Sequence, residues 1–148
     1  MSDAADPWRE LQDRAAIHDL IMRYARGVDR RDLELVATCF APDAGYEGSL
    51  GVGTIAIALE ALRDRMQRYR ATMHFMANQL VELNGDRASC ETYAIVYHRL
   101  DTEDEAQDYV VGVRYLDDLA RHGAGWWIVH RTTRLEFQRY DAVVLPPS

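Results

Sequence analysis

The sequence predicts an α+β fold, with helices in the first half of the chain and an antiparallel sheet in the second. Three helical segments are expected within residues 7–69, where apolar residues recur at spacings of three and four. From residue 72 onward, β-branched and aromatic residues alternate with polar ones, which is typical of strands with one buried face. Because the helices precede the strands, we expect them to cover one face of a single sheet.

The first two helices are expected to meet near Asp29. Asp6 is the expected N-cap of the first helix and Pro7 its first residue. Gly27 is the expected end of this helix, and Asp29 then caps a second short helix that stops before Pro42. The expected apolar stripe of the first helix is made of Trp8, Leu11, Ala15, His18, Ile21 and Tyr24.

A short strand at residues 45–50, carrying Tyr46, is expected to follow, and then a glycine-rich turn. The third helix is expected over residues 54–69, with its arginines on the outside. Its buried stripe should consist of Leu59, Leu62, Met66 and Tyr69.

A long hairpin is predicted from residues 72–83 and 87–100, which are joined by residues 84–86 of sequence Asn-Gly-Asp. A two-residue loop would place the two histidines of the hairpin on opposite faces of the sheet. A three-residue loop, which we favour, pairs Leu83 with Arg87. In that register one face carries His74, Met76, Ala94, Val96 and His98.

Two further strands are expected at residues 108–116 and 125–140, after an acidic solvated loop at residues 101–107. At 148 residues, with no repeat and no linker, the chain is expected to form one domain over residues 1–148. Its longest apolar run is too short to span a membrane, and the sequence shows no signal-peptide pattern. A cytoplasmic location is therefore expected.

The charge of the chain limits its partners. The formal net charge of -7 and the lack of a basic cluster argue against nucleic acid and anionic membranes as ligands. A neutral or apolar small molecule is the expected partner. The two cysteines, Cys39 and Cys90, lie far apart and indicate neither a disulfide framework nor a zinc motif.

Two histidines on an apolar face are the residues best suited to chemistry. A buried neutral histidine is tolerated when a carboxylate accepts one ring N–H, which leaves the other nitrogen free as a base. Asp29 is the candidate carboxylate for His74. The alternatives are that the histidines are satisfied core residues and Asp29 only a helix cap, or that Asp29, His74 and His98 bind a metal.

Residues 17–48, 72–100 and 111–137 resemble the SnoaL-like branch of the nuclear-transport-factor-two-like superfamily. That branch includes scytalone dehydratase, hexachlorocyclohexane dehydrochlorinase and bile-acid 7-dehydratase, which are cofactor-free eliminating enzymes with a His–Asp dyad. The resemblance implies a cone-shaped, strongly curved antiparallel sheet in which three N-terminal helices close a deep pocket.

Site residues follow from the same resemblance. It places the dyad on Asp29 and His74 and matches Tyr24 to a tyrosine five residues before the dyad aspartate. Tyr46 and His98 match a pocket tyrosine and a second pocket histidine. Arg131 or Thr132 on the last strand would also line the pocket, and only one of these neighbours can point inward. Met76 is expected in the pocket wall.

The resulting hypothesis is a cofactor-independent lyase, of the dehydratase or dehydrohalogenase type, that removes a carbon-bound proton from a mainly apolar, cyclic small molecule. No metal and no cofactor is expected. One alternative is an isomerase or cyclase of the ketosteroid-isomerase or polyketide-cyclase type. The other is a non-catalytic binding or dioxygenase-subunit-like assembly domain. A homo-oligomer, dimer or trimer, is expected because a wide curved sheet with outward aromatic residues needs a partner face.

Overall fold

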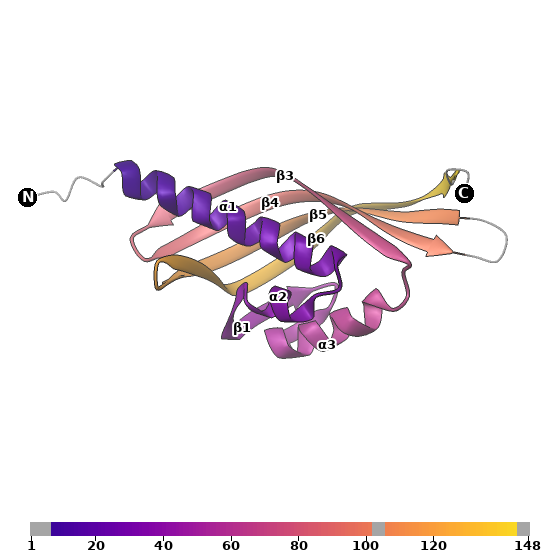
Figure 1. Ribbon diagram of the computed structural model, residues 1–148, viewed down its shortest axis with the longest axis horizontal. Helices are drawn as coiled ribbons and strands as arrows, with labels where there is room; N and C mark the ends of the chain where they lie inside the picture. The colour runs from indigo at the N-terminus through magenta and orange to yellow at the C-terminus, as the bar shows by residue number, and fades with distance from the viewer. Residues whose placement is uncertain (1–6, 102–105, 145–148) are drawn as a thin grey trace, which may run out of the picture.

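The computed structural model describes residues 7–101 and 106–144, and it confirms the α+β fold with helices first (Figure 1). The predicted N-cap Asp6 and most of the predicted acidic loop lie outside the described residues. In chain order the elements are α1 (Pro7–Asp29), α2 (Leu33–Ala37), β1 (Phe40–Gly48), β2 (Gly51–Thr54), α3 (Ile55–Met66), β3 (Ala71–Asn84), β4 (Arg87–Asp101), β5 (Ala106–His122) and β6 (Gly125–Val143).

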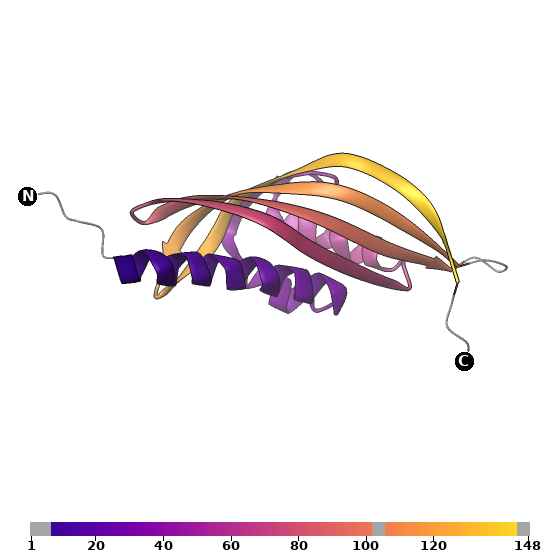
Figure 2. The ribbon, with the colours of Figure 1, turned by 90° about the horizontal axis from the view of Figure 1, so that it is seen from above.

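Within the described part of the chain, six strands form one curved sheet that does not close, in the order β2-β1-β6-β5-β4-β3. The helices lie on its concave side, and the sheet arches over them (Figure 2). All neighbouring strands are antiparallel except β1 and β6, which pair in parallel. The sequence prediction of a wholly antiparallel sheet is wrong at this pair, because the long connection between β1 and β6 allows either direction.

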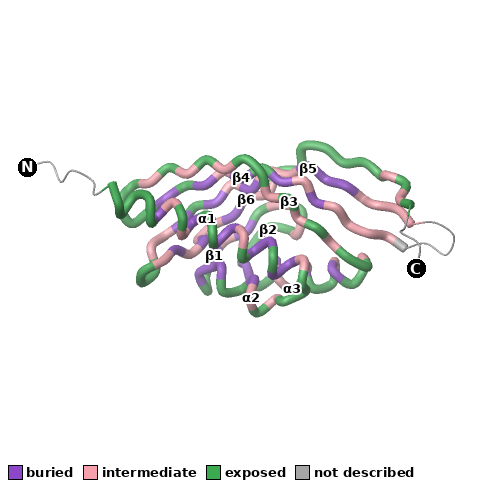
Figure 3. Tube along the Cα trace, turned by 45° about the horizontal axis from the view of Figure 1, so that its top comes forward, coloured by how far each residue is buried: buried purple, intermediate pink, exposed green. Residues whose placement is uncertain are grey.

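Buried residues follow the layer between the helices and the concave face of the sheet (Figure 3). Helix α1 packs against β3 and β6, and α3 packs against β1 and β2.

No helix among residues 7–101 and 106–144 has the length and apolar character needed to cross a membrane. Self-association stays a prediction. The edge strand β3 carries Met73 and Phe75 with 63% and 64% of their surface exposed.

Only the second half of helix α1 buries its predicted stripe, at Ile21 and Tyr24, whereas the first half buries a different face. Asp13 faces the sheet, because its carboxylate accepts hydrogen bonds from both terminal nitrogens of Arg121 at 2.8 Å and from the Trp126 indole at 3.0 Å. Two residues along a helix is roughly 200° of rotation, so Leu11 points away from the sheet. Trp8 and Leu11 are accordingly exposed, and the buried face contains Ile17, Leu20, Ile21, Tyr24 and Val28.

Gly27 does not end α1 but lies where α1 and α2 cross. A Cβ atom at this position would stand 2.7 Å from Cγ2 of Val36 and 3.1 Å from its backbone nitrogen. The helix therefore continues to Asp29. The chain then turns at Arg31, whose φ is 59°, and Asp32 caps α2 by accepting a hydrogen bond from the Leu35 N–H. The predicted capping role of Asp29 is wrong, and this leaves its carboxylate available to β3.

The Gly27→Ala variant is expected to lower the free energy of unfolding by about 1–3 kcal/mol, the usual cost of adding an atom to a packed contact. Urea denaturation measures this change. Arg26→Ala, at an exposed position one residue earlier, should stay within about 0.5 kcal/mol of the native protein. Equal stability of Gly27→Ala and Arg26→Ala would contradict the tight crossing.

The hairpin has a two-residue turn, not the predicted three-residue turn. Asn84 pairs with Arg87, and Gly85 begins the turn with a φ of 60°. Taken alone, this register would separate the two histidines. A β-bulge restores the predicted face, because residues 77 and 78 both lie between the pairs Met76–Ala94 and Gln79–Thr92, opposite the single residue Tyr93. Beyond the bulge, His74 pairs with Val96 and Thr72 with His98.

Candidate active site

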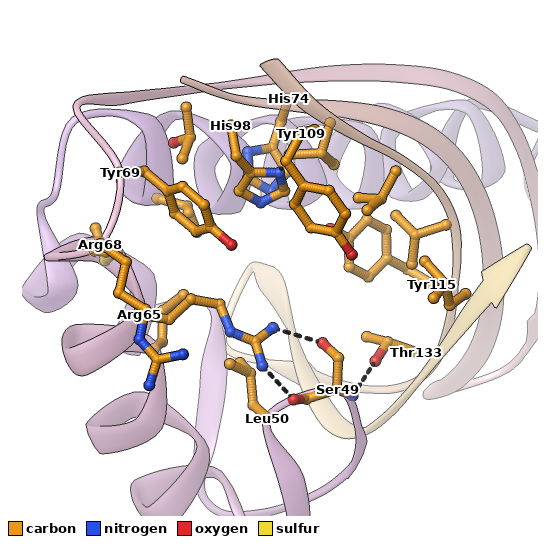
Figure 4. Close-up of a pocket in the computed structure, with 18 of the residues that line it drawn as sticks. Ser49, Leu50, Arg65, Arg68, Tyr69, His74, His98, Tyr109, Tyr115 and Thr133 are labelled. Atoms are coloured by element: carbon orange, nitrogen blue, oxygen red, sulfur yellow. Dashed lines mark hydrogen bonds between the residues drawn. The ribbon is translucent and has the colours of Figure 1, made fainter. Parts of the chain in front are cut away.

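A cavity of about 500 Å³ lies between the concave face of the sheet and helices α1 and α3 (Figure 4). Its wall is contributed by α1, α3, every strand except β2, and the segments that join β1 to β2 and α3 to β3. Aliphatic side chains make up much of it, together with two histidines, two arginines and the five tyrosines Tyr24, Tyr46, Tyr69, Tyr109 and Tyr115. Such a mixture suits a mainly apolar ligand that is oriented by a few polar groups.

His74 is fixed against Asp29 at one side of this cavity. Its ring Nδ1 lies 2.7 Å from Asp29 Oδ1, and its backbone N–H donates to Asp29 Oδ2 at 2.9 Å. The Thr72 hydroxyl donates to Asp29 Oδ1 at 2.9 Å. Because an ionised carboxylate only accepts, Nδ1 carries the proton and Nε2 keeps a lone pair. The sequence predicts this contact, and the structure places the two side chains in it.

Asp29 stays ionised although it is partly buried. Burial alone would raise the pKa of its carboxyl group, but the hydrogen bonds from the ring and backbone N–H of His74 and from the Thr72 hydroxyl help to hold the pKa below its usual value. A carboxylate at the last residue of α1 is also disfavoured by the helix dipole. The three donors from β3 compensate for both effects.

Two buried phenols, Tyr24 and Tyr115, pack against each other, and Tyr24 also contacts the His74 imidazole. The ring of Tyr24 contacts His74 edge to face, at a centroid distance of 6.2 Å, and contacts Tyr115 at 5.7 Å. Burial raises the pKa of Tyr24, and burial together with the neighbouring Tyr24 raises that of Tyr115 well above its ordinary value. Both phenols therefore remain protonated and can donate hydrogen bonds.

Tyr46 enters the cavity from β1, as predicted for a pocket tyrosine. Its hydroxyl lies 3.0 Å from the hydroxyl of Thr133, which also accepts a hydrogen bond from the Ser49 N–H at 3.3 Å. Thr133 thus connects the end of β1 to β6 at the floor of the cavity (Figure 4).

His98 lines the cavity, as the resemblance implies for a second pocket histidine, but it presents no ring N–H to it. Its Nδ1 donates to the backbone carbonyl of Tyr109 at 3.1 Å, so the neutral ring offers only an acceptor at Nε2. Burial lowers the pKa of His98 and outweighs the hydrogen bond to the Tyr109 carbonyl, which raises it, and the nearby Arg65 charge acts in the same direction as burial. His98 is thus better suited to accept a hydrogen bond from a substrate hydroxyl than to give one.

The depressed pKa of His98 predicts a pH-dependent stability. Below about pH 6.5 the unfolded chain binds a proton at this residue more readily than the folded protein does, so stability should fall as the pH falls. In His98→Gln, this part of the pH dependence should be absent. Urea denaturation of both proteins over about pH 5 to 8 measures it, and parallel curves would contradict the assignment.

Three residues expected at the pocket do not line it. Met76 is on the predicted face but packs into the core nearer the bulge. Arg131 points inward and is completely buried behind Tyr24 and Tyr115, where it pairs with Asp117. Thr132, of opposite parity, points to the convex side, and its hydroxyl lies 3.5 Å from His130 Nε2.

The sequence interpretation missed several residues of the wall. Strand alternation could have predicted three of them. Tyr109 pairs with His98, which is on the expected inward face, and Tyr115 and Thr133 pair with each other on that same face. Arg65 has no such signal, because an arginine on an amphipathic helix normally faces solvent. The missed wall residues with polar side chains are Ser49, Arg65, Arg68, Tyr69, Thr72, Tyr109, Tyr115 and Thr133.

A metal site at Asp29, His74 and His98 has no support from the geometry. Asp29 accepts the Nδ1–H of His74, so it stands behind the imidazole and not beside Nε2, where a shared metal ion would have to bind. Across the part of the chain that the structure describes, no three His, Cys, Asp or Glu side chains are grouped to hold a metal ion.

Comparisons with known proteins identify the family. Residues 9–132 match the family described as SnoaL-like domain. An uncharacterised protein of Mycobacterium tuberculosis is 27% identical over 133 residues, which cover 88% of this chain and 90% of that protein. A Mycobacterium bovis protein shows the same identity and the same coverage.

Solved structures share the fold. The hexachlorocyclohexane dehydrochlorinase LinA-type3 from Novosphingobium barchaimii superimposes with a TM-score of 0.82 at 21% identity, covering 96% of this chain and 100% of that one. A Novosphingobium aromaticivorans protein named as a candidate scytalone dehydratase superimposes with a TM-score of 0.79 at 18% identity, covering 88% of this chain and 89% of that one. The chain therefore belongs to the SnoaL-like family, within the nuclear-transport-factor-two-like superfamily that its sequence resembles.

Proposed function

We propose that this protein is a cofactor-independent lyase that eliminates water or a hydrogen halide from a mainly apolar, cyclic small molecule. The observation that carries the proposal is the pairing of His74 Nδ1 with Asp29 at 2.7 Å, on the wall of a cavity large enough for a ring compound. An imidazole held in this way is a general base aimed by a carboxylate. The relatives named as a dehydrochlorinase and a dehydratase support the same class.

In the proposed step, His74 Nε2 takes a proton from a substrate carbon. The electron pair of the broken C–H bond forms the new C=C bond, and the leaving group departs from the adjacent carbon with its own electron pair. A departing hydroxyl group leaves as water by taking up the proton that the His74 imidazolium has just gained, and this restores the neutral base. A halide leaves as the anion, and the imidazolium then returns its proton to solvent. In both cases Asp29 stabilises the imidazolium while it exists.

The tyrosines act on developing negative charge. Tyr24 is next to His74 and stays protonated, so its hydroxyl can donate to a carbonyl oxygen or a leaving group as the proton is removed. His98 orients a substrate hydroxyl by accepting its hydrogen bond, and it is not the source of the leaving-group proton.

An isomerase or cyclase is the second candidate, and the paired phenols favour it. Tyr24 contacts the base and Tyr115 adjoins Tyr24, an arrangement that suits an enolate oxygen. The enolate then collects a proton at another carbon or closes a carbon–carbon bond, with no leaving group lost.

Incubation in D₂O with cyclic β-hydroxy ketones, scytalone and hexachlorocyclohexane tests the proposal, with mass spectrometry of the products. Loss of water or hydrogen chloride that depends on His74 supports the lyase. Deuterium uptake without such loss supports the isomerase. Binding of these compounds with neither reaction would contradict both and favour a binding or assembly domain.

A further inference from the structure

Arg65 is a cation on the wall of a cavity that has no carboxylate lining. It lies on α3 and is partly buried, whereas Arg68 is exposed. Among the described residues that line the cavity there is no Asp or Glu, since Asp29 stands behind His74. The cavity thus differs in charge from the protein as a whole, whose formal net charge is -7.

The partners of Arg65 are neutral. Its Nη1 donates to the Ser49 hydroxyl at 2.9 Å, and its Nη2 donates to the Ser49 backbone carbonyl. These bonds use two of the five N–H groups of the guanidinium, and the structure gives the other three no acceptor within residues 7–101 and 106–144. A partly buried guanidinium usually has a carboxylate or phosphate partner.

The position of Arg65 within the cavity indicates where that partner belongs. Figure 4 shows its guanidinium held by Ser49 on the wall opposite His74 and His98, with Tyr69 and Tyr109 beside the open space between them. The ring of Tyr69 contacts His98 at a centroid distance of 4.6 Å, and His98 contacts Tyr109 at 5.5 Å. A ring compound lying along these aromatic groups has one end near the base and the other near Arg65.

We propose that the substrate is a cyclic compound that carries a carboxylate, and that Arg65 binds this carboxylate while the apolar ring occupies the cavity. The inference deepens the proposed lyase function. It rests on that function, because the bound compound is a substrate only if the protein is an enzyme. Ser49 fixes one edge of the guanidinium, so the remaining N–H groups are preorganised for a carboxylate. The anionic end anchors the molecule, and the carbon that loses its proton lies at the other end.

The test uses 2-naphthoate and its neutral analogue 2-naphthamide, with binding measured by isothermal titration calorimetry at pH 7. The native protein should bind the carboxylate at least about tenfold more tightly than the amide, as expected for a charge-assisted pair. Arg65→Gln should abolish this preference by weakening the binding of 2-naphthoate far more than that of 2-naphthamide. Arg65→Lys, which keeps the charge but not the fork, should retain part of it.

Arg63→Gln is the matched control, because Arg63 is an exposed arginine of the same helix outside the cavity wall and should keep the full preference. Equal affinities of the native protein for both probes would overturn the inference. So would an equal weakening of both probes in Arg65→Gln, since Arg65 would then serve only to hold Ser49.

Failure of this inference can be told apart from failure of the lyase. His74→Ala removes the proposed base but not the anion site, so it should keep the preference for 2-naphthoate. Absence of any elimination reaction together with an intact, Arg65-dependent preference would reject the lyase and leave a carboxylate-binding site. Elimination from neutral ring compounds without any preference for the carboxylate probe would reject the anion site alone.

Discussion

The His74→Ala variant is expected to lower kcat/KM for the elimination by about 10²–10⁴-fold, the usual contribution of a general base. The native imidazole is aimed by two contacts with Asp29, one through its ring and one through its backbone N–H. Removing the ring leaves the cavity and the phenols in place but no group to take the proton. Initial rates with a substrate identified in the D₂O screen give the effect, and circular dichroism checks the fold.

Asp29→Asn should also lower kcat/KM for the elimination, because an amide can donate to Nδ1 and so favours the wrong tautomer of His74. His18→Ala is the matched control. His18 is an exposed histidine of α1 whose ring contacts Gln79 and not the cavity. Unchanged turnover in His74→Ala or Asp29→Asn would reject the assignment of the dyad.

The second large effect is expected at Arg131 and Asp117. Both side chains are fully buried, and the guanidinium donates to the two carboxylate oxygens at 2.6 and 2.8 Å. Arg131→Met should therefore lower the free energy of unfolding by about 3–5 kcal/mol, because Asp117 is left as a buried charge without its partner. Chemical denaturation followed by tryptophan fluorescence measures the loss.

The double variant Arg131→Met/Asp117→Leu separates the ion pair from simple packing. Replacing both charges with apolar groups of similar size should recover most of the stability lost in the single variants. A double variant as unstable as the sum of the single variants would show that the pair contributes mainly through other contacts. Those contacts include the stacking of the guanidinium on Tyr24 and Tyr115, at 4.0 and 4.6 Å from the ring centroids.

The hairpin shows how far the sequence determines the site. The sequence predicts that His74 and His98 share a face because the turn has three residues. The structure places them on a common face, but the β-bulge and not the length of the turn brings this about. The tip is one residue shorter than predicted, and the bulge at residues 77 and 78 makes up the difference. These residues are Ala77 and Asn78, which are less common in strands than β-branched residues but also occur in regular ladders, so the sequence does not single out a bulge there.

Charged side chains inside the domain were the least predictable part of the site. An inward position for Arg131 follows from strand parity, but its distance from the cavity depends on Asp117, fourteen residues earlier on the neighbouring strand. Asp13 likewise sets the rotation of α1 through Arg121 and Trp126, more than a hundred residues away. Pairings of this kind are set by tertiary contacts, and the hydrophobic period of a segment does not record them.

The bulge in β3 also makes this strand unequal in its tolerance of evolutionary change. Adding or losing a residue at the exposed tip, around Gly85, alters only the loop. Losing residue 77 or 78 shifts the phase of one half of the strand, so that Met73 and Phe75 exchange sides with His74. Descendants of this protein that keep its chemistry should therefore vary in length at the tip and keep the same count of residues between His74 and Gln79.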